Sequence, residues 1–291
     1  MRVPLLSLGI FIISGALLLS SCTSPEAIAS FADNAQKVLD QGPPLFHDIH
    51  DSCLRRHAGA EKIAPIFLPA NSSSDATPPA NENPVCAPFA PQADALSKAS
   101  NVLSAYFRAM QQLASFNAST VSSENEQTAE NVATAAQLSV VQIDSVGKLA
   151  GLITQVFTGH YQRSHLLALI RAADPNISSV TQGFETIVSK DYESLLHEEQ
   201  QTVTARYQAV VDARDTATVL LLNRAYADDM NQLTRRKTTA DAYVEALQQI
   251  CEGHHKLAEN AGHLNVKELS LALQPYTTRL QALLPVLQKG L

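Results

Sequence analysis

The run HDIHDSCLRRH at residues 47–57 gathers three histidines, two aspartates and a cysteine, the side-chain types that bind metals and catalyse reactions. His47 and His50 are three residues apart and would share one face of a helix, as two ligands of one metal must. No HExxH motif or second cysteine pair accompanies them, and Cys53 and His57 lack the CxxCH spacing of haem attachment. His47 and His50 are therefore candidate metal ligands, but a solvated helix face explains them more simply.

A second group of ligand-type residues follows Cys251, where His254, His255 and His263 lie near a predicted helix end. Cys251 and His255 are four residues apart, a spacing that would let them hold zinc or copper from one helix face. Histidines near a helix C-terminus also interact favourably with the helix dipole, which explains them without a metal. The chain has no GxSxG, P-loop, GxGxxG or EF-hand pattern, so we expect neither an enzyme nor a cofactor.

Two charged runs are expected to be solvated faces of helices. Arg235, Arg236 and Lys237 form a short basic run, which we interpret as an exposed helical turn and not as an anion site. The run 197–199, which contains two glutamates, lies in the longest predicted helix and is assigned to its exposed face. Charged side chains are rarely buried unless they are paired.

The N-terminus predicts the compartment in which these residues act. Residues 1–21 carry Arg2 and then an apolar run to Leu19, which is shorter than the ~20 residues that span a bilayer and is typical of a secretory signal. Residues 19–22, Leu-Ser-Ser-Cys, resemble the lipobox of bacterial lipoproteins, and the resemblance covers only residues 1–22. It implies cleavage before Cys22 and attachment of acyl chains such as palmitate to this cysteine. Several chains make such an anchor effectively permanent.

The residue after the lipobox cysteine bears on localisation. Position 23 is Thr and not Asp. In the sorting rule of enterobacterial lipoproteins this implies export to the outer membrane, on the inner leaflet facing the periplasm. We therefore expect the chain to meet the membrane through its N-terminal lipid.

Cysteines in an oxidising periplasm are expected to form disulfides. With Cys22 acylated, Cys53, Cys86 and Cys251 remain, so at most one intramolecular bridge can form. We predict a Cys53–Cys86 bond because the two residues flank a Pro-, Ser- and Asn-rich loop at 65–92, which the bond would fasten to the helix before it. Cys251 is expected to be a buried thiol.

Composition and periodicity predict the elements that position these residues. Aromatic residues make up 5% of the chain, Trp is absent and only 11 residues are Gly, which favours helix over sheet. We predict an all-α fold, an elongated antiparallel helical bundle with coiled-coil-like long helices. After the signal peptide, the expected divisions are a tether with short helices at 22–64, the loop at 65–92 and the bundle domain at 93–291.

The longest predicted helix is capped by Asp174 and Pro175 and keeps an apolar period from Ile177 to Leu221. A break is expected near residues 227–229. The net charge of −7 argues against a nucleic-acid partner. We expect a lipid-anchored helical scaffold or interaction protein of the bacterial envelope with a protein partner. The alternative is an envelope lipoprotein that binds a metal or a small ligand.

Overall fold

The computed structural model describes residues 25–61, 83–115, 138–158, 166–212, 216–260 and 266–290. Within these ranges the chain is helical apart from short turns and has no strand, which confirms the all-α bundle. None of the described helices is both long enough and apolar enough to cross a membrane. The elements in order are α1 (Pro25–Leu39), α2 (Gly42–Glu61), α3 (Phe89–Ala114), α5 (Val140–Thr158), α6 (Leu166–Thr186), the π-helix η7 (Ile187–Tyr192), α7 (Glu193–Asp212), α8 (Thr216–Asn260) and α9 (Val266–Gly290).

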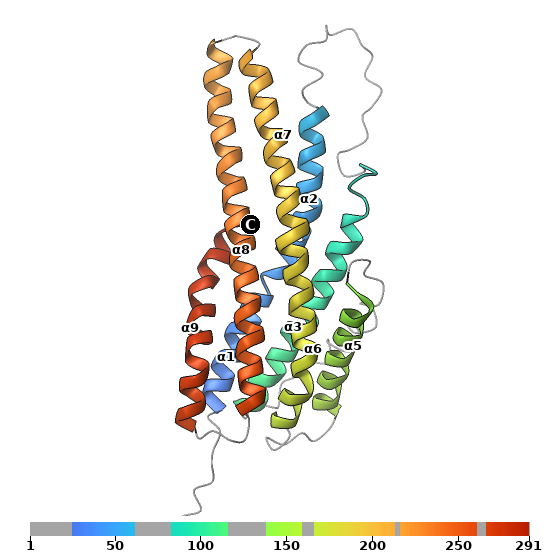
Figure 1. Ribbon diagram of the computed structural model, residues 1–291, viewed down its shortest axis with the longest axis vertical. Helices are drawn as coiled ribbons and strands as arrows, with labels where there is room; N and C mark the ends of the chain where they lie inside the picture. The colour runs from blue at the N-terminus through green and yellow to red at the C-terminus, as the bar shows by residue number, and fades with distance from the viewer. Residues whose placement is uncertain are drawn as a thin grey trace, which may run out of the picture.

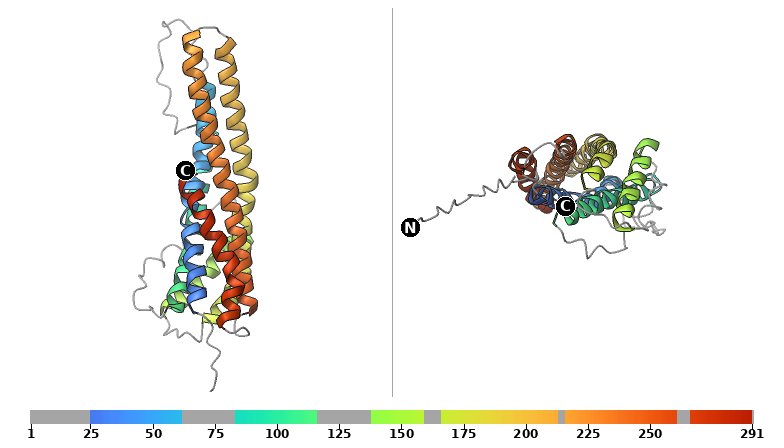
Figure 2. Two further views of the ribbon diagram at one scale, coloured as in Figure 1. Left: turned by 90° about the vertical axis from the view of Figure 1, so that its left-hand side faces the viewer. Right: turned by 90° about the horizontal axis from the view of Figure 1, so that it is seen from below.

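The helices pack side by side along one long axis (Figure 1). One end of the molecule contains α1, α5, α6, α9 and the second half of α8. At the other end α7 and the first half of α8 run antiparallel and extend beyond α2, as both side views show (Figures 1 and 2). We call the part formed by residues 200–212 and 216–229 the hairpin tip.

Apolar residues at helical spacing form one continuous core. In α1 the side chains of Ile28, Phe31 and Val38 are buried, and in α2 Leu45 and Ile49 are buried at the predicted four-residue spacing. These residues join the same cluster as the apolar faces of α3, α5, α6, α8 and α9. The segment 22–64 therefore contributes two helices to the bundle core.

The turn between α1 and α2 depends on a glycine. A Cβ atom at Gly42 would lie 2.5 Å from the hydroxyl oxygen of Tyr243 and 2.7 Å from that of Ser100. Ser100 also donates a hydrogen bond to the carbonyl of Leu39, the last residue of α1. Gly42, the first residue of α2, therefore lets this helix begin where α3 and α8 approach closely.

Three predicted helix boundaries are wrong. Pro175 lies inside α6 and not at a helix start, and the helical path continues through η7 and α7 to Asp212. The predicted long helix does not reach Leu221, because α7 ends at Asp212 and α8 begins at Thr216. The break expected at 227–229 is absent from α8, which is continuous over 45 residues. The lipobox and most of the loop predicted at 65–92 lie outside the described residues.

The predicted disulfide is confirmed. The Sγ atoms of Cys53 and Cys86 lie 2.05 Å apart and their Cα atoms 5.7 Å apart. Cys53 is on α2, and Cys86 lies in the turn three residues before α3 begins. The bond therefore fastens the middle of α2 to the start of α3. Cys251 is a free thiol and is half-buried, less than predicted.

Replacing both cysteines of this bond, in the double variant Cys53→Ser/Cys86→Ser, should lower the free energy of unfolding by roughly 3 to 4 kcal/mol. The reason is that a closed loop of about 34 residues restricts the unfolded chain. Urea denaturation followed by circular dichroism measures the loss. Cys251→Ser is the control and should change stability by less than about 1 kcal/mol. A double variant as stable as this control would contradict the prediction.

Candidate functional site

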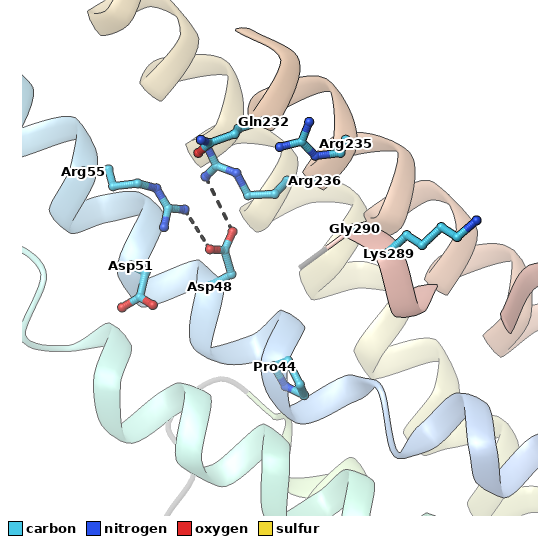
Figure 3. Close-up of a pocket in the computed structure, with 9 residues that line it drawn as sticks. All are labelled: Pro44, Asp48, Asp51, Arg55, Gln232, Arg235, Arg236, Lys289 and Gly290. Carbon is cyan, nitrogen blue, oxygen red and sulfur yellow. Dashed lines mark hydrogen bonds and ion pairs between the residues drawn. The ribbon is translucent and has the colours of Figure 1, made fainter. Parts of the chain in front are cut away.

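A cavity of about 490 Å³ opens between α2, α8 and the end of α9 (Figure 3). Charged side chains from all three helices dominate its wall. The residues that line it are Pro44, Asp48, Asp51, Arg55, Gln232, Arg235, Arg236, Lys289 and Gly290. A second cavity, of about 180 Å³, shares Arg55, Gln232 and Arg236 with the first. The two arginines thus lie between the cavities.

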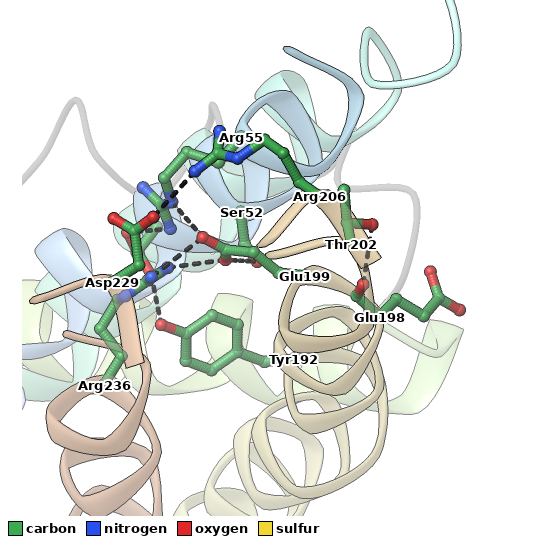
Figure 4. A network of polar contacts seen from close by, with 10 residues as sticks. Ser52, Arg55, Tyr192, Glu198, Glu199, Thr202, Arg206, Asp229 and Arg236 are labelled. Atoms are coloured by element: carbon green, nitrogen blue, oxygen red, sulfur yellow. Dashed lines mark hydrogen bonds and ion pairs between the residues drawn. The ribbon is translucent and has the colours of Figure 1, made fainter. Parts of the chain in front are cut away.

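The carboxylate of Glu199 organises this wall (Figure 4). Arg236 of α8 donates to both of its oxygens, at 2.7 and 2.9 Å. Arg55 of α2 donates through Nε at 2.9 Å, and the Ser52 hydroxyl donates at 2.7 Å. Since Glu199 itself is on α7, one carboxylate joins three helices.

Asp48 extends the network from α2. It accepts a hydrogen bond from Arg55 Nη2 at 2.8 Å and lies 3.6 Å from Arg236 Nη1. The Tyr192 hydroxyl also donates to Asp48. Tyr192 is the last residue of the π-helix η7, whose wider turn changes the direction of side chains along α6 and α7. Such turns are frequent at functional sites.

Both members of the Glu199–Arg236 pair are charged at neutral pH. Burial alone would raise the pKa of Glu199, but hydrogen bonds from Arg236 and Ser52 and the nearby arginine charges hold this pKa below its usual value. Burial alone would lower the pKa of Arg236, but the hydrogen bond and charge of Glu199 raise it. The Glu199 and Arg236 side chains of this wall are therefore both charged, and charge-assisted hydrogen bonds hold them in place.

The prediction that Glu199 and Arg236 lie on exposed faces is wrong. Glu199 is 3% exposed and Arg236 8% exposed. Each occupies a position that continues an apolar period, since Glu199 follows Leu195 by four residues and Arg236 follows Leu233 by three. A charge at such a position, with an opposite charge on another helix, is the signal that could have identified the site.

The structure brings together a different set of potential metal ligands from the pair His47 and His50. His47 is exposed, 3.9 Å from Asp94, and His50 lies 3.6 Å from Asp51. The ligand atoms of Cys53, His57 and Cys86 lie within 4.8 Å of one another, the sole such group found among the described residues. The two sulfurs of this group are bonded to each other, so they are not thiolate ligands in this state.

Histidines on α8 belong to a separate buried chain of hydrogen bonds. His254 contacts the Tyr106 hydroxyl through Nε2 at 2.8 Å and Asp174 through Nδ1 at 2.9 Å. Burial lowers the pKa of His254, so its neutral ring accepts from Tyr106 and donates to Asp174. His255 donates to the other oxygen of Asp174 at 2.8 Å, and this bond raises the pKa of His255.

Asp174 therefore has a different role from the helix cap predicted for it. It joins α6 to α8 through two histidines, and Tyr106 extends the chain to α3. His255, a candidate metal ligand with Cys251, points its Nδ1 at Asp174. Burial alone would raise the pKa of Asp174, but the hydrogen bonds from His254 and His255 hold it below its usual value.

Comparison with known proteins identifies no relative. No family model, curated protein or solved structure matches the chain.

Glu199→Ala should lower the free energy of unfolding by about 3 to 5 kcal/mol, because it leaves the buried Arg236 without its partner. Glu198→Ala is the matched control, since Glu198 is the adjacent residue, is half-exposed and pairs with Arg56 at the surface. The control should lose less than about 1 kcal/mol. Urea denaturation at pH 7 compares the two variants, and equal losses would contradict a central role for Glu199.

Asp174→Asn should lower the free energy of unfolding by about 1 to 3 kcal/mol at pH 7, because buried His254 loses its charged acceptor. The depressed pKa of Asp174 gives stability that is present above the unfolded-state value of about 3.9 and is lost as the pH falls through the lower folded-state value. The difference between wild type and variant should therefore shrink below about pH 4.

Denaturation at pH 7, 5 and 3.5 measures that difference. Asp144→Asn is the control, since Asp144 is exposed and pairs with Lys148 one turn away. This control should remain close to wild type at each pH. A difference for Asp174→Asn that is larger at pH 3.5 than at pH 5 would contradict the expected sign.

Proposed function

We propose that this chain is a lipid-anchored, periplasm-facing helical scaffold or interaction protein of the bacterial envelope, whose hairpin tip contacts a protein partner. The observation that carries the proposal is the extension of α7 and α8 beyond the rest of the bundle, at the end opposite the start of α1 (Figure 1). Beyond the end of α2 no other described helix runs beside this pair, which leaves faces of both helices for a partner (Figure 1).

The hairpin tip is held together by side chains that leave its outer surface available. The rings of Tyr207 and Tyr226 stack with centroids 4.4 Å apart. Arg206 and Asp229 form an ion pair at 2.9 Å across the two helices. Leu220 lies on the outside of this part and is 68% exposed. A tip whose two helices are tied together and that exposes a leucine suits recognition of a protein.

The lipobox supports the membrane anchor in this proposal. Cys22 precedes the first residue of α1 by three positions, so acylation would hold this end of the bundle at the membrane. The 45 residues of α8 span about 68 Å at 1.5 Å per residue. The hairpin tip would then stand several tens of ångströms from the membrane surface, within reach of a partner in the periplasm.

Catalysis is not part of the proposal. Tyr106, His254 and Asp174 form a chain of residue types that enzymes use, but Tyr106 and His254 are completely buried. A substrate would have to reach Tyr106 or His254 before these hydrogen-bonded residues could act as a nucleophile and a base. Their role in the proposal is to join α3, α6 and α8.

A photo-crosslinking amino acid at position 220 tests the proposal in cells that express the full chain. We expect irradiation to give one discrete adduct with an envelope protein, and the unmodified chain to fractionate with membranes. Globomycin, which blocks lipoprotein signal cleavage, should cause the precursor to accumulate. Immunoblotting of fractions and mass spectrometry of the adduct measure these outcomes.

Position 98, at the exposed Lys98 of α3, is the matched control for the crosslinker and should give no such adduct. Cys22→Ala should abolish both the globomycin effect and membrane fractionation. Processing that ignores globomycin would reject the lipid anchor. Adducts of equal yield from positions 220 and 98 would reject the hairpin tip as the contact.

A further inference from the structure

Among the described residues, the cavity between α2, α8 and α9 has a small excess of positive charge, because four basic side chains of its wall stand against the carboxylates of Asp48 and Asp51 in the wall and of Glu199 beneath it. Arg55 and Arg236 are compensated by Glu199 and Asp48. Arg235 and Lys289 also line the cavity and are exposed, and neither has an ion pair with a carboxylate in the described part of the chain. This local excess of cations is notable in a chain whose net charge is −7.

The end of α9 is placed at this cavity by a close helix contact. A Cβ atom at Gly290 would lie 1.5 Å from Thr239 Oγ1, so only glycine lets the last turn of α9 approach α8 so closely. Thr239 is buried and lies one turn after Arg235 and Arg236. The contact therefore brings the last turn of α9, with Lys289 and Gly290, to the cavity wall, and in Figure 3 the Lys289 side chain extends from this turn away from Arg235 and Arg236.

We infer that this cavity binds a small soluble polyanion that carries carboxylate or phosphate groups. Arg235 and Lys289, opposed in part by the Asp51 carboxylate of the same wall, supply the net positive charge, and guanidinium groups match the geometry of both kinds of oxyanion. Gln232 adds an amide that can donate to the ligand or accept from it. The volume of about 490 Å³ falls within the range of small-ligand pockets, which favours a free solute over a macromolecule.

The hydrogen-bonded network beneath the cavity lowers the conformational entropy that is lost when a ligand binds. Arg236 is held by both oxygens of Glu199, and Arg55 is held by Glu199 and Asp48, so this wall is already ordered before a ligand arrives. Only the long side chains of Arg235 and Lys289 must be immobilised. Because both are solvent-exposed, the attraction should weaken as salt is added.

Isothermal titration calorimetry of the full chain in nonionic detergent tests the inference, with citrate and pyrophosphate as probes at low ionic strength. We expect one saturable site per chain for at least one probe. The double variant Arg235→Gln/Lys289→Gln should weaken binding at least tenfold. Raising the salt to 0.5 M should also weaken it.

The matched control is Arg108→Gln/Lys98→Gln, which removes the same charge from exposed positions outside the cavity and outside the hairpin tip. It should bind the probe as tightly as wild type does. Equal weakening in both double variants would overturn the inference, because binding would then follow overall charge. Failure of both probes to bind would also overturn it. Neither result depends on the lipid anchor or on the hairpin tip, so the proposed function is tested separately.

Discussion

The buried carboxylate of Glu199 is the constraint on which the upper half of the molecule depends. A charge that is withdrawn from water must be paired and hydrogen-bonded, and Glu199 finds its partners only when α2, α7 and α8 stand in one register. Apolar faces of long helices can slide by a turn with little loss, whereas this pairing cannot. The pairing therefore specifies which turn of α8 faces which turn of α7.

A second polar chain constrains the other end of the bundle. His254 lies 18 positions after Arg236 on α8, and it fixes α8 against α3 and α6 through Tyr106 and Asp174. The stretch of α8 between these two points is buried through Tyr243 and Leu247, which belong to the apolar core. The helix α8 is thus positioned by polar contacts at Arg236 and His254 and stabilised by apolar burial between them.

The spacing of apolar residues predicts the helices well. The predictions fail where tertiary contacts override a local sequence signal. The spacing of Leu45, Ile49 and Cys53 correctly predicts one face of α2. Asp174 and Pro175 have the local chemistry of a helix start, yet α6 continues through them, and Asp174 instead accepts from two histidines 80 positions away. Glu199 and Arg236 cannot be assigned to the interior from one helix alone, because burial of each depends on a partner far along the chain.

The motif at residues 47–57 acquires its role from this arrangement. Cys53, held by Cys86, fixes the middle of α2. Ser52 and Arg55, its neighbours on the helix, reach Glu199, while Asp48 one turn earlier reaches Arg236 and Tyr192. A disulfide next to the network limits movement of the helix that supplies the cavity wall on that side. Cys53 and Asp48, two residues of the motif that suggest metal chemistry in the sequence, therefore hold α2 in place beside the cavity that four basic side chains line.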